Sequence, residues 1–314
     1  MNQLTLEDEK VIKYLAKYKI MLVEDTKLIY NSKWYHRKKV KRLIEEGFIK
    51  KYKFYYIELD RKGRKLVGKV GVDYIKNKNN VSYMERLKEL SHLATISIDS
   101  NIKINPSWEL KDREIFTDTA RKYLAEMQIN QYKFLIYYIS SKKEKRYIHQ
   151  LFYDINKVFN YESIIIFIDD FKNIINEKDY MYFNKEHTYI IKNTEINRNM
   201  IKHFSTIDFY EILQNCYKEN ILISDWKLAN YYLKNNHYIL KMPFIDMSKI
   251  NELNWYLEEN IESKKYIDIV TLEENKEFLL KTLRKDNRIK IITLENNKLL
   301  EGEGSGGIKE CKEK

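Results

Sequence analysis

Hydrophobic positions near the start of the chain recur at the spacing of a helix. Val11, Ile12 and Leu15, followed by Ile20, place apolar side chains on one face of the segment EDEKVIKYLAKY (7–18) and beyond it. The first turn of that segment is acidic, which the helix dipole favours. The segment VEDTKLIY (23–30) predicts a short second helix.

A third helix is predicted for KWYHRKKVKRLIEEG (33–47), with Asn31 and Ser32 as caps and Gly47 at its end. Its apolar positions fall on one face: His36, Val40, Leu43 and Ile44. We therefore expect His36 to be packed and not to read bases, and we expect Trp34 to anchor the core. The cationic side chains of this helix then project largely outward.

Two strands and a further helix follow the third helix. FIKKY (48–52) and FYYIELD (54–60) predict a hairpin joined near Lys51–Lys53, and LDRKGRKLVGK (59–69) begins another helix. Three helices and a hairpin form the winged-helix plan, in which the third helix enters the major groove of DNA. We therefore expect an α+β fold, with an N-terminal winged helix-turn-helix in residues 1–75.

The rest of the chain alternates buried strands with helices. KFLIYYIS (133–140) and ESIIIFID (162–169) flank a helical segment at 144–159, which predicts a parallel strand pair and an α/β body. The same strand–helix–strand order is predicted for YIDIVTL (266–272), a helix at 274–285, and RIKIITL (288–294). Helices are also expected at 209–217 and 225–233. We expect a linker at 77–81, α/β domains at 82–195 and 196–300, and a disordered tail at 301–314.

The basic charge is confined to one quarter of the chain. Residues 1–80 hold twenty-one Lys and Arg against ten Asp and Glu, a net charge of +11 that equals the charge of all 314 residues. The remaining residues hold thirty-six of each sign. Lys, Asn, Ile and Tyr are abundant throughout, so the lysine count alone carries little information. A focused basic patch, however, is typical of a polyanion partner.

The expected contacts with double-stranded DNA divide by role. Base edges are expected to be reached from the start of the third helix, by Ser32, Lys33, Tyr35 and Arg37. Phosphates are expected to be held by Lys38, Lys41 and Arg42 on the helix and by Lys50, Lys51 and Lys53 on the hairpin. Arg61, Lys62, Arg64 and Lys65 could equally contact DNA or form a solvated helix start. Because one winged helix buries little surface, a homodimer is expected.

Several classes of protein are disfavoured by the sequence. No glycine occurs between 72 and 301, which excludes the usual glycine-rich nucleotide-binding loops there, so no nucleotide cofactor is expected. The longest apolar run, SIIIFI (163–168), is far too short to cross a bilayer, and the N-terminus lacks the pattern of a signal peptide. The two cysteines, Cys216 and Cys311, and the six histidines show no metal or disulfide spacing. We expect a cytoplasmic protein without cofactor or metal.

A family resemblance adds to this reading. The basic N-terminal segment, SHLATISI (91–98), Trp108-Glu109, Asp118 and the strand at 133–140 resemble, in order and spacing, the replication-relaxation family of mobile genetic elements. The resemblance covers about residues 5–170. It implies a role in plasmid replication or in relaxing plasmid DNA, and a second domain similar to restriction endonucleases.

The departures from that family bear on catalysis. Glu109 and Asp118 match two metal-binding positions, but the buried strand has Tyr137, Tyr138 and Ile139 where the family has further acids. Phenols do not replace carboxylates as ligands of a hard cation. Asp169 and Asp170 could complete a site only if they point the same way, although acids at strand ends more often cap loops. We therefore expect a degenerate domain in residues 82–195.

Three functions remain open at this point. The first is a DNA-binding protein of a plasmid or phage that acts in replication initiation, in its control or in transcriptional regulation. The second is a metal-dependent nickase that uses Glu109 and Asp118. The third is an interaction module whose basic quarter docks an acidic protein.

Overall fold

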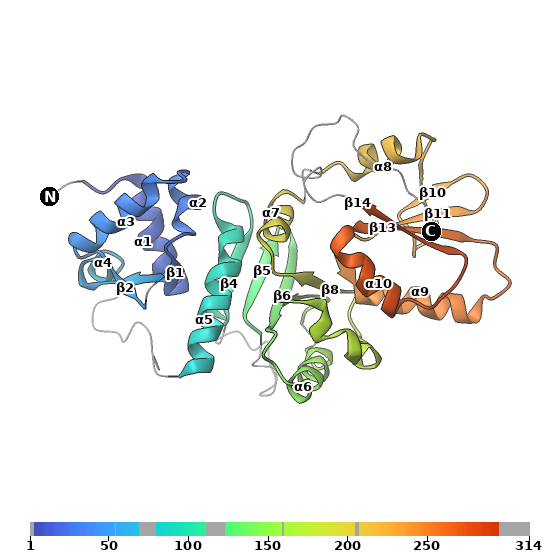
Figure 1. Ribbon diagram of the computed structural model, residues 1–314, viewed down its shortest axis with the longest axis horizontal. Coiled ribbons are helices and arrows are strands. Elements are labelled where there is room, and N and C mark those ends of the chain that lie inside the picture. The colour runs from blue at the N-terminus through green and yellow to red at the C-terminus, as the bar shows by residue number, and fades with distance from the viewer. Residues whose placement is uncertain are drawn as a thin grey trace. The chain divides into compact units, whose positions relative to one another are not determined.

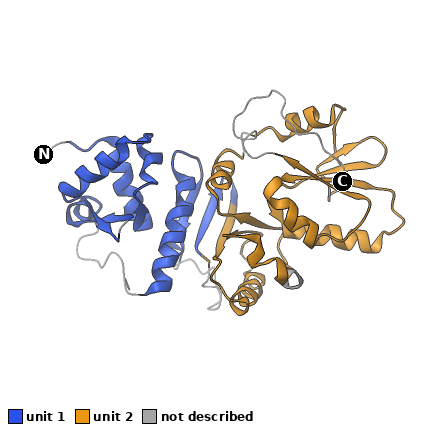
Figure 2. Ribbon diagram, viewed as in Figure 1, with its two compact units in different colours: residues 1–112, 124–132 blue, residues 113–123, 133–314 orange. Residues whose placement is uncertain are grey.

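The computed structural model describes residues 3–53, 55–68, 80–110, 123–158, 160–204 and 207–294 (Figure 1). Its contacts divide the chain into two units, Met1–Asp112 with Leu124–Tyr132, and Arg113–Tyr123 with Lys133–Lys314 (Figure 2). The chain is a mixed α/β protein with parallel strand pairs, as the hydrophobic pattern predicted. Among the described residues, no helix combines the length and apolar character that a membrane span requires.

The first unit begins with alternating helices and strands. In chain order they are α1 (Leu6–Tyr18), β1 (Ile20–Leu22), α2 (Thr26–Tyr30), α3 (Tyr35–Glu45), β2 (Ile49–Tyr52), β3 (Tyr56–Leu59) and α4 (Arg61–Leu66). The three strands form an antiparallel sheet in the order β1-β3-β2. The predicted three helices, hairpin and following helix are therefore present, and Ile20 belongs to a strand that the sequence pattern did not indicate.

The core of this region lies where the helical spacing predicted it. Val11, Ile12 and Leu15 of α1 are buried, and Thr5 caps the helix by accepting the N–H of Asp8. On α3 the buried side chains are His36, Val40 and Leu43. The expectation that Trp34 anchors the core is wrong, because Trp34 is 75% exposed. It precedes the first helical residue, where helical spacing no longer fixes the direction of a side chain.

Helix α5 and the following strands also belong to the first unit. They comprise α5 (Val81–Ala94), η1 (Thr95–Ser97), β4 (Lys103–Pro106), η2 (Ser107–Glu109) and β5 (Ala125–Ile129), with β4 and β5 antiparallel. Tyr14 of α1 donates a hydrogen bond to the Ser91 carbonyl at 2.6 Å, and Tyr18 donates one to the Ile104 carbonyl at 3.0 Å. These contacts group α5 with α1, whereas the sequence pointed to a boundary at 77–81, of which 77–79 lie outside the described residues.

The second unit contains the first predicted strand–helix–strand segment. Its elements are β6 (Tyr132–Ile139), α6 (Lys145–Asn156), β7 (Ser163–Ile168), η3 (Phe171–Asn173), η4 (Ile175–Tyr180) and β8 (His187–Lys192). Strands β6, β7 and β8 are parallel neighbours, and β12 (Ile245–Asp246) pairs antiparallel with β8. The helix between β6 and β7 makes the parallel connection possible, as expected.

A five-stranded sheet completes the second unit. Its strands run in the order β14 (Ile289–Leu294), β13 (Tyr266–Leu272), β11 (His237–Lys241), β10 (Tyr231–Leu233) and β9 (Leu222–Ile223). The accompanying helices are α7 (Glu195–His203), α8 (Phe209–Tyr217), α9 (Met247–Glu259), η5 (Glu273–Asn275) and α10 (Lys276–Thr282). The second predicted repeat, β13–α10–β14, is confirmed as a parallel pair.

The helix predicted for 225–233 is wrong, because this segment ends in strand β10. Asn235 and Asn236 both have positive φ angles, +63° and +61°, and Leu233 pairs with His237. Two successive residues with positive φ form the turn that matches the twist of a hairpin, and asparagine tolerates that conformation. The turn therefore commits residues 231–241 to two strands.

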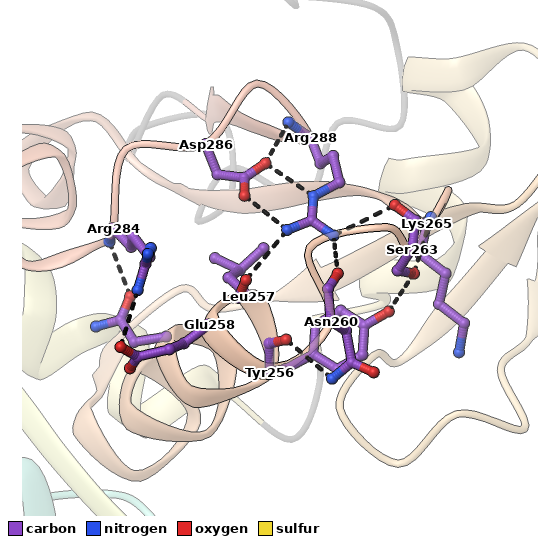
Figure 3. A network of polar contacts seen from close by, with 10 residues as sticks. Tyr256, Leu257, Glu258, Asn260, Ser263, Lys265, Arg284, Asp286 and Arg288 are labelled. Carbon is purple, nitrogen blue, oxygen red and sulfur yellow. Dashed lines mark hydrogen bonds and ion pairs between the residues drawn. The ribbon is translucent and has the colours of Figure 1, made fainter.

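The buried Arg288 secures the C-terminal end of α9 (Figure 3). Its guanidinium donates to both carboxylate oxygens of Asp286, at 2.9 and 2.7 Å, and to the Asn260 carbonyl at 2.6 Å. Weaker hydrogen bonds reach the carbonyls of Ser263 and Leu257, at 3.3 and 3.4 Å. Carbonyl groups at a helix end lack intrahelical donors, so Arg288 acts as a structural cap.

Candidate nucleic-acid interface

Helix α3 separates a buried face from a charged one. With His36, Val40 and Leu43 packed inside, Lys38 and Lys41 are exposed on the opposite face, three residues apart. Arg37 lies beside them on the helix and is also exposed. The fold thus directs Arg37, Lys38 and Lys41 toward solvent.

The start of α3 is held by Ser32. Its Oγ accepts the N–H of Tyr35 at 2.9 Å, and its carbonyl oxygen lies 3.0 Å from Nδ1 of His36. The hydroxyl expected to read bases therefore serves the helix start, as the predicted capping role requires. Lys33 and Tyr35 are exposed on either side of Trp34.

Arg37 has an acidic partner at the surface. Its guanidinium donates to the Glu24 carboxylate at 3.0 Å, with the two side chains 66% and 45% exposed. The hydrogen bond from Arg37 lowers the pKa of the Glu24 carboxyl. Exposed pairs of this kind stabilise a fold by about 1 kcal/mol or less, so the guanidinium can exchange Glu24 for another anion at little cost.

Arg42 has a different role from the one expected. Its guanidinium is hydrogen-bonded to Asp8, which is fully buried and also accepts the Tyr30 hydroxyl and the Thr5 N–H, each at 2.8 Å. Burial raises the pKa of Asp8, but the hydrogen bonds outweigh it and hold the pKa below the ordinary 3.8. The pair joins α1 to α3, where we had expected Arg42 to contact a phosphate.

The hairpin presents two exposed lysines. Lys51 and Lys53 are exposed, and Lys53 has a positive φ of +54° in the turn between β2 and β3. Lys50 is half-buried and lies 3.4 Å from the carboxylate of the buried Glu58. Of the three predicted hairpin contacts, Lys51 and Lys53 are therefore the accessible ones.

Several of these cations have no acid of their own. Within the part of the chain that the structure describes, no ion pair is formed by Lys33, Lys38, Lys51 or Lys53. Lys41 lies 3.8 Å from Glu45 in an exposed pair. Together with Arg37 these residues form what we call the basic surface: Lys33, Arg37, Lys38, Lys41, Lys51 and Lys53.

Sequence reasoning missed two exposed aromatic side chains beside the basic surface. Trp34 is 75% exposed and Tyr55, in the hairpin, is 71% exposed, while the predicted contact Tyr35 is 54% exposed. The Nζ of Lys33 lies 5.8 Å from the centroid of the Trp34 ring, and that of Lys39 lies 5.3 Å from the Tyr35 ring. The alternation of basic and aromatic residues in KWYHRKK (33–39) is the signal that could have revealed this feature.

Of the two carboxylates proposed for a nuclease, only Glu109 belongs to the described residues. Glu109 is exposed in η2, and Asp118 lies outside the described residues. Burial lowers the pKa of Lys17, and the nearby Glu109 carboxylate opposes that shift. No group of three or more His, Cys, Asp or Glu able to hold a metal occurs in the described ranges.

Asp169 and Asp170 organise the loop after β7, as acids at strand ends commonly do. Asp169 accepts hydrogen bonds from the Tyr138 hydroxyl and, at 2.7 Å, from the Ser141 N–H. Asp170 caps η3 by accepting the Lys172 N–H at 3.0 Å. Both carboxylates therefore form local hydrogen bonds in the loop after β7.

Comparison of the chain with protein-family models, with curated proteins and with solved structures finds no match. The functional argument therefore depends on the residues themselves.

Proposed function

We propose that residues 1–75 form a winged-helix domain that binds double-stranded DNA, with α3 as the reading helix and the β2–β3 hairpin as the wing. The order α1-β1-α2-α3-β2-β3 and the β1-β3-β2 sheet support this assignment. The observation that carries the proposal is the basic surface, whose exposed cations lie on the two elements that such a domain presents to DNA.

Phosphate capture is the main source of affinity in this proposal. Lys38, Lys51 and Lys53 have no competing carboxylate among the described residues, so they neutralise phosphates without first breaking an ion pair. Each neutralised phosphate releases counterions from the duplex, and binding therefore weakens as salt rises. Lys33, Tyr35 and Arg37, at or just before the start of α3, would contact base edges.

The biological setting follows from the resemblance noted in the sequence. We propose that the protein acts in the cytoplasm on plasmid or phage DNA, in replication initiation, in its control or in gene regulation. A homodimer would read two half-sites, because one winged helix covers little DNA. The residues after 80, whose charges of both signs balance, would provide the subunit or partner contact.

Fluorescence anisotropy with a labelled random-sequence duplex tests this proposal. We expect binding at about 50 mM salt that weakens by at least tenfold at about 200 mM salt. Polyglutamate of matched length serves as the control, because it offers negative charge without the spacing of DNA phosphates. Failure to bind any duplex at low salt, with tight binding of polyglutamate, would replace the proposal with an acidic protein partner.

A further inference from the structure

We propose that the basic surface also stacks unpaired nucleobases, so that its preferred substrate is a duplex that adjoins unpaired bases, as in a melted bubble or a fork. This inference rests on the proposed DNA binding and narrows its substrate. It is carried by Trp34, Tyr35 and Tyr55.

These three aromatic side chains are unusually exposed for their size. Trp34 is 75% exposed, Tyr55 71% and Tyr35 54%, although aromatic side chains are mostly buried on average. Trp34 and Tyr35 stand at the start of α3, and Tyr55 lies in the hairpin immediately before β3. Tyr35 therefore belongs to the proposed reading helix, Trp34 directly precedes that helix, and Tyr55 belongs to the proposed wing.

Hydrogen bonds connect the hairpin and α3 through one short segment. The Tyr55 carbonyl accepts the N–H of Val23 at 2.8 Å, and the next residue, Glu24, accepts a hydrogen bond from Arg37 at 3.0 Å. The backbone of Tyr55 and the side chain of Arg37 therefore both contact the segment at 23–24.

The chemistry of the basic surface suits a base with its phosphate. Every nucleobase has two apolar faces that stack on aromatic rings, whatever the sequence, but in an intact duplex the neighbouring base pairs cover those faces. Lys33 and Lys39 hold their ammonium groups 5.8 and 5.3 Å from the ring centroids of Trp34 and Tyr35. Each ring therefore has a cation beside it that can hold the phosphate of the nucleotide whose base it stacks.

Charge favours a nucleic acid over a second copy of the chain as the occupant. Two copies that met through these aromatic residues would bring Lys33, Lys38 and Lys53 against their equivalents, and like charges in an interface oppose association. DNA supplies the complementary charge and the aromatic faces together. Unpaired bases therefore match both the positive charge and the exposed rings of this surface.

The test compares two DNAs of the same length and sequence, one fully paired and one with a short central bubble. Anisotropy at fixed salt should show binding to the bubble about tenfold tighter than to the duplex. Trp34→Ala should remove that preference while leaving duplex affinity within about twofold, and Trp34→Phe should retain most of it. Quenching of the Trp34 fluorescence by the bubble should be absent from both variants, because both lack the indole of Trp34.

Trp255→Ala is the matched control, because Trp255 is 66% exposed on α9 in the second unit. It should leave the preference for the bubble unchanged. Equal binding of bubble and duplex by the native protein would refute the inference and leave duplex binding intact. Failure to bind either DNA would refute the proposed function as well.

Two further outcomes would also overturn the inference. An equal loss of both affinities in Trp34→Ala would mean that Trp34 contacts the intact duplex. A dimer in sedimentation experiments without DNA that Trp34→Ala dissociates would assign Trp34 to a subunit contact. Circular dichroism of each variant would verify that the fold is retained.

Discussion

The guanidinium of Arg37 on α3 donates a hydrogen bond to the Glu24 carboxylate, at 3.0 Å, in the segment that precedes α2. Nε2 of the buried His36 lies 3.5 Å from the same carboxylate. Glu24 therefore lies beside α3, the proposed reading helix. In the proposed complex, DNA would compete with the Glu24 carboxylate for Arg37.

Replacing Glu24 with Gln tests that competition. The variant should bind every duplex several-fold more tightly, with a steeper dependence on salt, because the positive charge of Arg37 is no longer neutralised by Glu24. Anisotropy titrations at several salt concentrations measure both effects. The control is Glu277→Gln, which removes another exposed acid, 2.7 Å from Lys281 in the second unit. Equal affinities of Glu24→Gln and Glu277→Gln would contradict this role of Glu24.

Arg37 and Lys51 should differ in what they contribute to binding. Arg37→Ala should relax sequence preference, because arginine at the start of a reading helix contacts base edges. Lys51→Ala should weaken binding to all duplexes alike and reduce the salt slope by about one unit. Titrations with a selected site and a scrambled site distinguish these effects. Identical behaviour of the two variants would argue against separate roles.

The buried Asp8 should be important for stability. Asp8→Asn leaves Arg42 without its carboxylate partner, and breaking a buried pair costs about 3 kcal/mol of unfolding free energy. Asp99→Asn is the matched control, because Asp99 pairs with Lys10 at 3.0 Å on the surface and should cost less than about 1 kcal/mol. Urea denaturation measures the unfolding free energy that each variant loses. Equal losses would show that burial of Asp8 does not determine the effect.

Acid should weaken the contact between Asp8 and Arg42. Because the pKa of Asp8 in the folded chain lies below its ordinary 3.8, the unfolded chain takes up the proton first as the pH falls. The contribution of Asp8 is therefore complete above about pH 5 and is lost as the pH falls below about 4. The stability difference between the native protein and Asp8→Asn should shrink over that range. A difference that stays constant would contradict the lowered pKa.

Helical periodicity explains why the core of α3 could be predicted and its surface only in part. His36, Val40 and Leu43 repeat at helical spacing, so their burial follows from local pattern alone. The direction of Trp34 depends on how the chain enters the helix, which spacing does not encode. Arg42 could not be assigned, because its partner Asp8 lies thirty-four residues earlier.

The second unit likewise has features that the sequence predicts and features that it does not. Its strand–helix–strand repeats could be predicted from continuous apolar runs, because parallel strands that are buried on both faces have such runs. Apolar spacing predicts a helix at 225–233, but the turn at Asn235-Asn236, which lies after this segment, makes residues 231–233 a strand. Aspartates such as Asp169 could be placed at strand ends, but their hydrogen-bond partners depend on neighbouring strands.

The number of phosphates held by unpaired lysines tests the central claim most directly. Changing Lys38, Lys51 and Lys53 together to Gln should flatten the slope of log affinity against log salt by about three units. A variant with three exposed lysines of the second unit changed to Gln, Lys234, Lys264 and Lys276, should keep the native slope. Equal slopes in the two variants would contradict a DNA interface on α3 and the hairpin.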